Sequence, residues 1–167
     1  MTDLEGPHEV FLRPGELWFG GGDIRVRTLL GSCVAVTLWH PAARIGGMCH
    51  YMTPSRPAGT PADELNGRYA DEALLMLLEG VAAASTSPQE YQVKMFGGGT
   101  QFAVPAGSPV DVAAWNVEAG LQLLEAHGLR LSAMHLGGTG HRQVILDIDR
   151  GDVWMRHVDI SEELVLR

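Results

Sequence analysis

Cysteine is scarce in this sequence, and its scarcity excludes a fold held together by disulfides. Only Cys33 and Cys49 occur among 167 residues, whereas small extracellular domains with weak cores depend on several disulfide bonds. A chain of this length can bury a hydrophobic core without them. We therefore expect both cysteines to be thiols in a reducing cytoplasm.

Basic side chains are also few. The chain has 12 Lys and Arg residues against 20 Asp and Glu residues, which gives a formal net charge of −8. Proteins that bind nucleic acids need clusters of Lys and Arg to replace the counterions of the phosphates, and anionic lipid surfaces attract the same residues. We therefore expect neither nucleic acid nor an anionic lipid surface among the partners.

Long apolar segments are absent from the sequence. No apolar run approaches the roughly 20 residues that span a bilayer. The start of the chain, Met1–Glu5, is acidic and has no apolar stretch behind a basic residue, unlike a secretory signal. We expect a cytoplasmic protein without membrane insertion.

Motifs for metals and nucleotides are missing as well. The seven histidines are scattered and form no HxH or HExxH pattern, whereas structural zinc needs four close ligands. The glycine runs at 97–100 and 137–140 match neither the phosphate loop nor the dinucleotide fingerprint. We expect no metal and no organic cofactor. We interpret the two runs as tight turns at strand ends, or as turns that shape the mouth of a site, because backbone can approach a substrate closely there.

The apolar patterns that are present predict two helices. The first covers 66–84, where apolar residues recur at spacings of three and four. Its stripe consists of Tyr69, Ala73, Leu74, Leu77, Leu78 and Val81. The second is expected to begin near Ser108-Pro109, since serine caps helices and proline fits their first turn. Gly128 is its expected C-terminal stop.

Shorter apolar segments predict seven or eight strands. They cover residues 16–19, 24–28, 34–39, 45–52, 91–96, 131–136, 143–148 and 152–158. The Pro- and Gly-rich residues 53–65 are typical of a surface loop. Mostly sequential strands with two helices indicate an α+β fold with a largely antiparallel sheet. We expect residues 1–14 to be a loose arm and residues 15–167 to form one domain.

The hairpin predicted for 34–52 brings a thiol and an imidazole together. If its turn is centred on Pro41-Ala42, Leu38 faces Ile45 and Cys33 faces His50. Directly opposed Cβ atoms lie roughly 4.5–5.5 Å apart, which lets a histidine take a proton from a cysteine. Cys49 points to the other face, because side chains alternate along a strand, and we interpret it as a packing residue.

Two readings of Cys33 and His50 stay open from the residues alone. A cysteine in an apolar strand is often an inert packing residue, and a lone histidine is often a satisfied core residue. In favour of catalysis, Gly31 and Ser32 precede Cys33. A turn there can leave the backbone N–H groups of Ser32 and Cys33 free to hold an oxyanion.

Several motifs resemble one known family over most of the chain. They are Leu30–Val34, Gly46–Met52 with Pro54, Arg68–Asp71, Lys94–Gly99, Asn116, Gly137, Gly138, Gly140 and Arg142. The sequence resembles the CheD family of bacterial chemoreceptor glutamine deamidases. The resemblance implies a β-sandwich-like core with the two main helices packed outside, so that 15–167 would be a single CheD-like deamidase domain.

The resemblance also implies a Cys-His-Thr site without a cofactor. Cys33 and His50 occupy the matching positions. The family threonine lies six residues before the cysteine, where this chain has Arg27, and Thr28 lies five before. An offset of one residue changes the face of a regular strand, and a bulge can restore it. We assign Thr28 as the third catalytic residue, with Ser32 contributing to the oxyanion site.

The implied substrates are the cytoplasmic domains of methyl-accepting chemotaxis receptors. In this reading a cysteine thiolate converts receptor glutamine to glutamate, and some relatives also bind a CheC-type phosphatase. One alternative is a non-catalytic regulator of such a phosphatase, which the departures at Arg27 and Cys49 leave open. Another is a different thiol amidase or peptidase, because these enzymes share the Cys/His chemistry.

Overall fold

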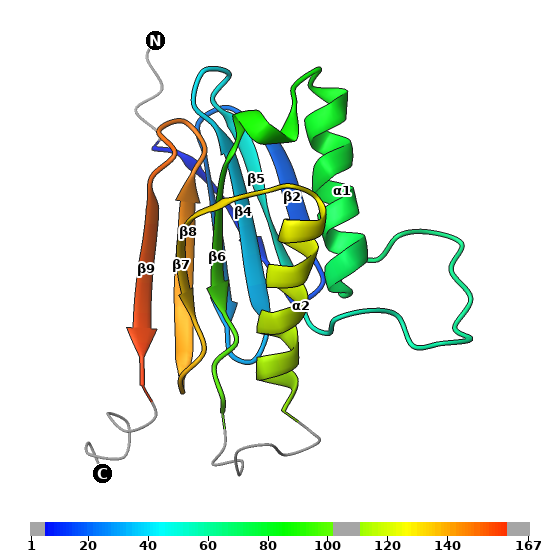
Figure 1. Cartoon of the computed structure of the whole chain (residues 1–167). Coiled ribbons are helices and arrows are strands. Elements are labelled where there is room, and N and C mark those ends of the chain that lie inside the picture. The colour runs from blue at the N-terminus through cyan, green and yellow to red at the C-terminus, as the bar shows by residue number, and fades with distance from the viewer. Residues whose placement is uncertain (1–5, 102–110, 160–167) are drawn as a thin grey trace.

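The computed structural model describes residues 6–101 and 111–159, which form an α+β fold (Figure 1). The strands are β1 (His8–Leu12), β2 (Leu17–Gly21), β3 (Ile24–Leu30), β4 (Val34–His40), β5 (Ile45–Tyr51), β6 (Gln92–Gly97), β7 (Leu131–Leu136), β8 (His141–Asp147) and β9 (Val153–Val158). The helices are α1 (Ala70–Ala83) and α2 (Val112–Ala126), with a short 3-10 turn η1 (Pro88–Glu90). The predicted fold class is confirmed.

The described strands form two sheets. One has the order β1-β3-β8-β9 and the other has the order β2-β5-β4-β6-β7. The β1–β3 and β6–β7 pairs are parallel, and the other pairs are antiparallel. The sheet is therefore largely antiparallel, as the sequence predicts.

The two sheets pack face to face around an inter-sheet core. Its buried members are Leu12, Val26, Leu30, Ala35, Met48, Phe96, Val144, Leu146 and Ile148. The opposite face of the five-stranded sheet packs on the helices through a second cluster, which includes Val36, Leu38, Cys49 and Tyr51 from strands and Ala73, Leu77 and Leu124 from helices. Figure 1 shows α1 and α2 side by side on this outer face, which confirms the sandwich with external helices.

The expected loose arm is wrong for residues 8–12. These residues form β1, which pairs in parallel with β3, and Leu12 is buried. The apolar residues of this segment, Val10, Phe11 and Leu12, form a short run between polar residues and Pro14, and so short a run does not by itself predict a strand. Its stability comes from a partner strand further along the chain.

The predicted register of the β4–β5 hairpin is also wrong. Leu38 pairs with Gly47, and Ala35, not Cys33, pairs with His50. The turn spans four residues and ends in Arg44 with a left-handed φ of 53°, while the Ala43 amide donates to His40 Nδ1 at 2.9 Å. This longer turn shifts the pairing by two positions, so each side chain keeps its face.

Helix α1 starts later than the sequence suggests, and the predicted start of α2 lies outside the described residues. Tyr69 has extended dihedrals and bridges to Thr53, so α1 begins at Ala70 instead of residue 66. The predicted start at Ser108-Pro109 lies outside the described residues, and Asp111 caps α2 by accepting a hydrogen bond from the Ala114 amide at 3.1 Å.

Two further predictions about the helices and loops hold. Gly128 adopts a φ of +69° after the last helical residue, as expected of a C-terminal stop. The chain between β5 and α1, which contains the predicted 53–65 loop, projects away from the sandwich (Figure 1). Neither helix in the described part of the chain has the length and apolar content to cross a membrane.

Candidate active site

Thr28 lies on the inner face of β3. Val26, Thr28 and Leu30 alternate inward and are at most 1% exposed. The pairing of β3 with β8 continues without a register shift, so no bulge is needed. Arg27 points outward, where it forms an ion pair with Glu9. Thr28, not Arg27, is therefore the residue that reaches the inter-sheet space.

A relay of hydrogen bonds fixes the tautomer of His50. Thr28 Oγ1 lies 2.8 Å from the carbonyl oxygen of Leu12 and 2.7 Å from His50 Nδ1. A carbonyl oxygen only accepts, so the single hydroxyl proton of Thr28 goes to Leu12. Thr28 must then accept a hydrogen from His50 Nδ1. The neutral ring consequently carries its proton on Nδ1 and a lone pair on Nε2.

His50 is kept neutral by burial. The side chain is 1% exposed, and desolvation lowers its pKa to about 4. Nε2 is buried and has no hydrogen-bond partner among residues 6–101 and 111–159. At neutral pH the ring is therefore uncharged, and the lone pair of Nε2 is available to accept a proton.

Cys33 lies immediately before β4 and is partly exposed. It packs against the inter-sheet core, and Ala35, two positions later, pairs with His50. Cys33 therefore lies on the same side of the sheet as His50, two positions before the residue that pairs with it. Burial raises the pKa of the Cys33 thiol, and the Ser32 side chain opposes this in part. A thiol with a raised pKa needs a base to become a nucleophile.

Cys49 differs from Cys33 in the face of the sheet that it occupies and in its complete burial. It faces the helices in the cluster with Val36 and Leu38 and is 1% exposed, which confirms the predicted opposite face. Burial raises its pKa to about 12. Both cysteines are free thiols.

The glycine runs hold the backbone beside Cys33. The Gly98 amide donates to the Cys33 carbonyl oxygen and the Gly99 amide to that of Gly31, both at 2.9 Å. Gly97 has a φ of +115°, and a Cβ there would lie 2.3 Å from the Cys33 carbonyl oxygen. Both runs lie at strand ends, as predicted. The 97–100 run borders the candidate nucleophile, and the 137–140 run contacts the 97–100 run through the Gly137 amide and the Gly97 carbonyl oxygen.

Arg142 cross-links these turns, a role that the sequence did not suggest. Its buried guanidinium donates to the carbonyl oxygens of Gly97 at 3.2 Å and Gly137 at 2.6 Å, and to His135 Nδ1 at 2.9 Å. Desolvation lowers its pKa. The available signal was its position on the inward-facing series with Val144 and Leu146, where a charged residue must have partners.

The candidate oxyanion donors are the amides at the β3–β4 connection. Within the described residues, the backbone N–H groups of Ser32 and Cys33 donate no hydrogen bond. These N–H groups can therefore donate hydrogen bonds to an oxyanion. In the same part of the chain, no three His, Cys, Asp or Glu side chains form a group suited to a metal ion.

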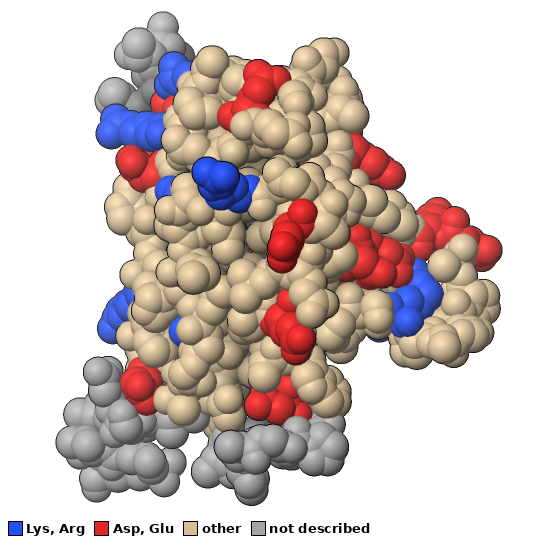
Figure 2. All heavy atoms as spheres, in the orientation of Figure 1, with Lys and Arg blue, Asp and Glu red and all other residues tan. Residues whose placement is uncertain are grey.

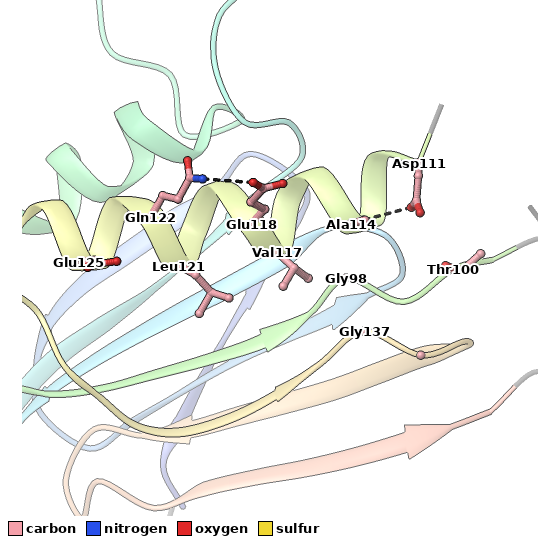
Figure 3. Close-up of a pocket in the computed structure, with 11 residues that line it drawn as sticks. Gly98, Thr100, Asp111, Ala114, Val117, Glu118, Leu121, Gln122, Glu125 and Gly137 are labelled. Carbon is pink, nitrogen blue, oxygen red and sulfur yellow. Dashed lines mark hydrogen bonds between the residues drawn. The ribbon is translucent and has the colours of Figure 1, made fainter. Parts of the chain in front are cut away.

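An open groove of about 500 Å³ lies between α2 and the turns at Gly98 and Gly137 (Figure 3). Val117 of α2 points toward the turn at Gly98, and Leu121 points into the groove one turn further along the helix (Figure 3). The groove shares Gly98 with the Cys33 backbone contact. Its acidic lining residues are Asp111, Glu118 and Glu125. Figure 2 shows acidic atoms along the surface over α2.

Known proteins resemble this chain over nearly all of its length. The family described as CheD chemotactic sensory transduction matches residues 52–157. A probable chemoreceptor glutamine deamidase CheD 3 of Dechloromonas aromatica is 50% identical over 148 residues, which covers 89% of this chain and 86% of that protein. A probable chemoreceptor glutamine deamidase CheD of Pseudomonas syringae pv. tomato is 48% identical over 167 residues, which covers 98% of both chains.

Among solved structures, the Bacillus licheniformis hypothetical protein YfiH matches 70% of this chain and 47% of its own chain. The TM-score is 0.41 and the sequence identity is 11%. This likeness supports no argument about the site.

Proposed function

The chain belongs to the CheD family, and on that premise we propose that it hydrolyses glutamine side-chain amides of chemoreceptors with Cys33 as the nucleophile. The observation that carries the proposal is the relay from the Leu12 carbonyl through Thr28 to His50. It leaves an unprotonated Nε2 on the side of the sheet on which Cys33 packs. No metal or organic cofactor takes part in the proposed reaction.

The reaction begins with proton transfer. His50 Nε2 takes the proton of the Cys33 thiol as the sulfur attacks the carboxamide carbon of the substrate. Thr28 holds the ring through Nδ1 and stabilises the imidazolium that forms. The N–H groups of Ser32 and Cys33 donate hydrogen bonds to the carboxamide oxygen and stabilise the negative charge that develops on it.

The tetrahedral intermediate then loses ammonia. Protonated His50 gives its proton to the leaving nitrogen, because an unprotonated amide nitrogen leaves poorly. The C–N bond breaks and a thioester on Cys33 remains. His50 next removes a proton from water, and the resulting hydroxide cleaves the thioester. The products are glutamate, ammonia and the regenerated thiol.

The groove beside α2 favours a polypeptide substrate over a small amide. It is open and lined by Val117 and Leu121 as well as by glycine turns, so it can accept the chain on either side of the target glutamine. Its acidic rim also disfavours retention of the product, since the new carboxylate is negatively charged. We propose that the segment bound there belongs to the cytoplasmic domain of a methyl-accepting receptor.

Mass spectrometry of a purified receptor cytoplasmic fragment tests the proposal. Incubation with the protein should convert specific glutamines to glutamates, and a Cys33→Ala variant should convert none. Cys49→Ala is the matched control and should retain the activity of the parent, since Cys49 faces the helices. Equal deamidation by the parent and Cys33→Ala would exclude the thiol mechanism.

Two finer points belong to the same proposal. A cytoplasmic location suits an enzyme with two free thiols. A CheC-type phosphatase as a second partner is implied by the family, and co-elution of the two purified proteins tests it. Failure to co-elute would remove that partner and leave the deamidase proposal intact.

A further inference from the structure

Asn116 of α2 joins the two segments that carry Cys33 and His50. Its side chain is fully buried. Its Nδ2 donates to the carbonyl oxygen of Ser32 at 3.1 Å and to that of Met52 at 2.8 Å. Ser32 directly precedes Cys33, and Met52 follows His50 by two positions. One amide group therefore connects the entry of β4 to the end of β5.

Tyr51 reinforces this junction from the β5 side. Its hydroxyl donates to the backbone carbonyl oxygen of Asn116 at 2.5 Å. Gly120, one turn further along α2, leaves room for this contact, because a Cβ there would lie 2.4 Å from the Tyr51 hydroxyl. The sequence of α2 is thus adapted to hold residues next to both proposed catalytic side chains.

The side-chain amide of Asn116 is only partly hydrogen-bonded. Its Oδ1 is buried without a hydrogen-bond partner among the described residues. A buried acceptor without a partner destabilises a fold, and an apolar side chain at this helix position would avoid the penalty. The two hydrogen bonds that Nδ2 donates offset this penalty. They hold the carbonyl groups of Ser32 and Met52.

The bond to Ser32 orients a particular N–H group. The Ser32 carbonyl and the Cys33 N–H belong to one planar trans peptide and point in opposite directions. Holding the Ser32 oxygen toward α2 aims the Cys33 N–H away from that helix. Hydrogen bonding at the oxygen also polarises the peptide and strengthens its N–H as a donor.

We propose that Asn116 is a positioning residue that orients the backbone N–H of Cys33 as an oxyanion donor. The inference rests on the proposed deamidase function, because it assumes that Cys33 attacks a carbonyl carbon. Asn116 does not touch the reacting atoms and acts only through the Ser32–Cys33 peptide.

Two reactions of the same thiol separate this role from general support of the fold. Attack on an amide or an activated ester passes through an oxyanion, whereas alkylation by iodoacetamide is a displacement that forms none. In Asn116→Ala we expect kcat for receptor deamidation to fall about 10- to 100-fold, since removing one oxyanion donor costs about 100- to 1,000-fold. KM and the alkylation rate of Cys33 should stay close to those of the parent.

Two further variants complete the test. Thr86→Val is the matched control, because it removes hydrogen bonds to the Val81 carbonyl oxygen at 2.8 Å and to the Tyr91 hydroxyl at 2.6 Å, outside the site. It should change neither rate. Tyr51→Phe keeps the Asn116 amide and loosens its anchor; if Asn116→Ala does not fold, this variant must lower kcat and spare alkylation.

The outcomes are distinct from those that test the deamidase proposal. Acylation of Cys33 by p-nitrophenyl acetate also forms an oxyanion and needs no receptor, so it reports on Asn116 even if no receptor is deamidated. Loss of acylation with intact alkylation supports the inference. Parent-like acylation and deamidation in folded Asn116→Ala, or equal losses in acylation and alkylation, would overturn it.

Discussion

Replacing Thr28 with valine removes a hydroxyl at the centre of the relay and changes the side-chain shape little. The variant breaks the 2.8 Å bond to the Leu12 carbonyl oxygen and the 2.7 Å bond to His50 Nδ1. The Leu12 carbonyl oxygen and His50 Nδ1 then stay buried and lose their hydrogen bonds to the hydroxyl. Each unsatisfied group costs about 1–3 kcal/mol, so the two together should lower the free energy of unfolding by about 2–6 kcal/mol, measured by urea denaturation.

The catalytic loss in Thr28→Val follows from the tautomer. Without an acceptor at Nδ1 the ring of His50 is free to rotate and to carry its proton on Nε2, where it cannot serve as a base. General-base catalysis contributes about 100- to 10,000-fold. We expect kcat for receptor deamidation to fall about 100-fold, which corresponds to about 2.7 kcal/mol of activation free energy. KM should not change.

The assay is deamidation of a receptor fragment, followed by mass spectrometry at a temperature where the variant is folded. Alkylation of Cys33 should fall as well, since formation of the thiolate depends on His50. Thr28→Ser is the matched control, because it retains the hydroxyl and should keep kcat within about threefold of the parent. Parent-like kcat in folded Thr28→Val would refute the relay.

Four other predictions follow from the site. The pKa of His50 is lowered from 6.5 to about 4, so the unfolded chain binds more protons than the folded chain between these pH values. As pH falls from 6.5 to 4, the free energy of unfolding should therefore decrease by ~3 kcal/mol. Urea denaturation at the two pH values should show a decrease larger by that amount in the parent than in His50→Leu. Alkylation of Cys33 should still rise above pH 9, because burial raises its pKa; a plateau near neutral pH would contradict this. Arg142→Met should lower the free energy of unfolding by about 3–5 kcal/mol, because the carbonyl oxygens of two glycine turns lose a charged donor; a parent-like urea midpoint would count against the cross-link. Leu121→Asp should raise KM for the receptor about tenfold with kcat unchanged, since it puts a charge in the apolar wall of the groove; an unchanged KM would remove the groove from the substrate site.

The faces of the catalytic strands were predictable from the sequence, although their register was not. Alternation along β4 and β5 depends only on local chain geometry, so Cys49 and His50 were assigned to opposite faces correctly. The register depends on the turn, where Arg44 adopts a left-handed φ and His40 accepts from the Ala43 amide. No residue pattern at 41–44 announces that conformation, which is why the prediction failed by two positions.

For Thr28, the proposed third catalytic residue, the local pattern was a better guide than the family spacing. A family spacing that pointed to Arg27 left Thr28 dependent on a bulge, yet the plain alternation of Val26, Thr28 and Leu30 already placed the threonine inward. The role of Arg142 and the parallel pairing of β1 with β3 could not be predicted from local sequence patterns. Their roles depend on contacts between segments far apart in the chain, such as Gly97 with Arg142.

The last acceptor of the His50 relay is a main-chain carbonyl, and this has a consequence for how the site can be lost. Changing the side chain of Leu12 leaves that oxygen in place, whereas detachment of β1 from β3 withdraws it. The fraction of molecules with a competent base should therefore track the docking of β1, a five-residue edge strand. Hydrogen exchange at the backbone amides of residues 8–12 would then measure the fraction of molecules in which His50 can act as a base, although these residues are distant in sequence from Cys33.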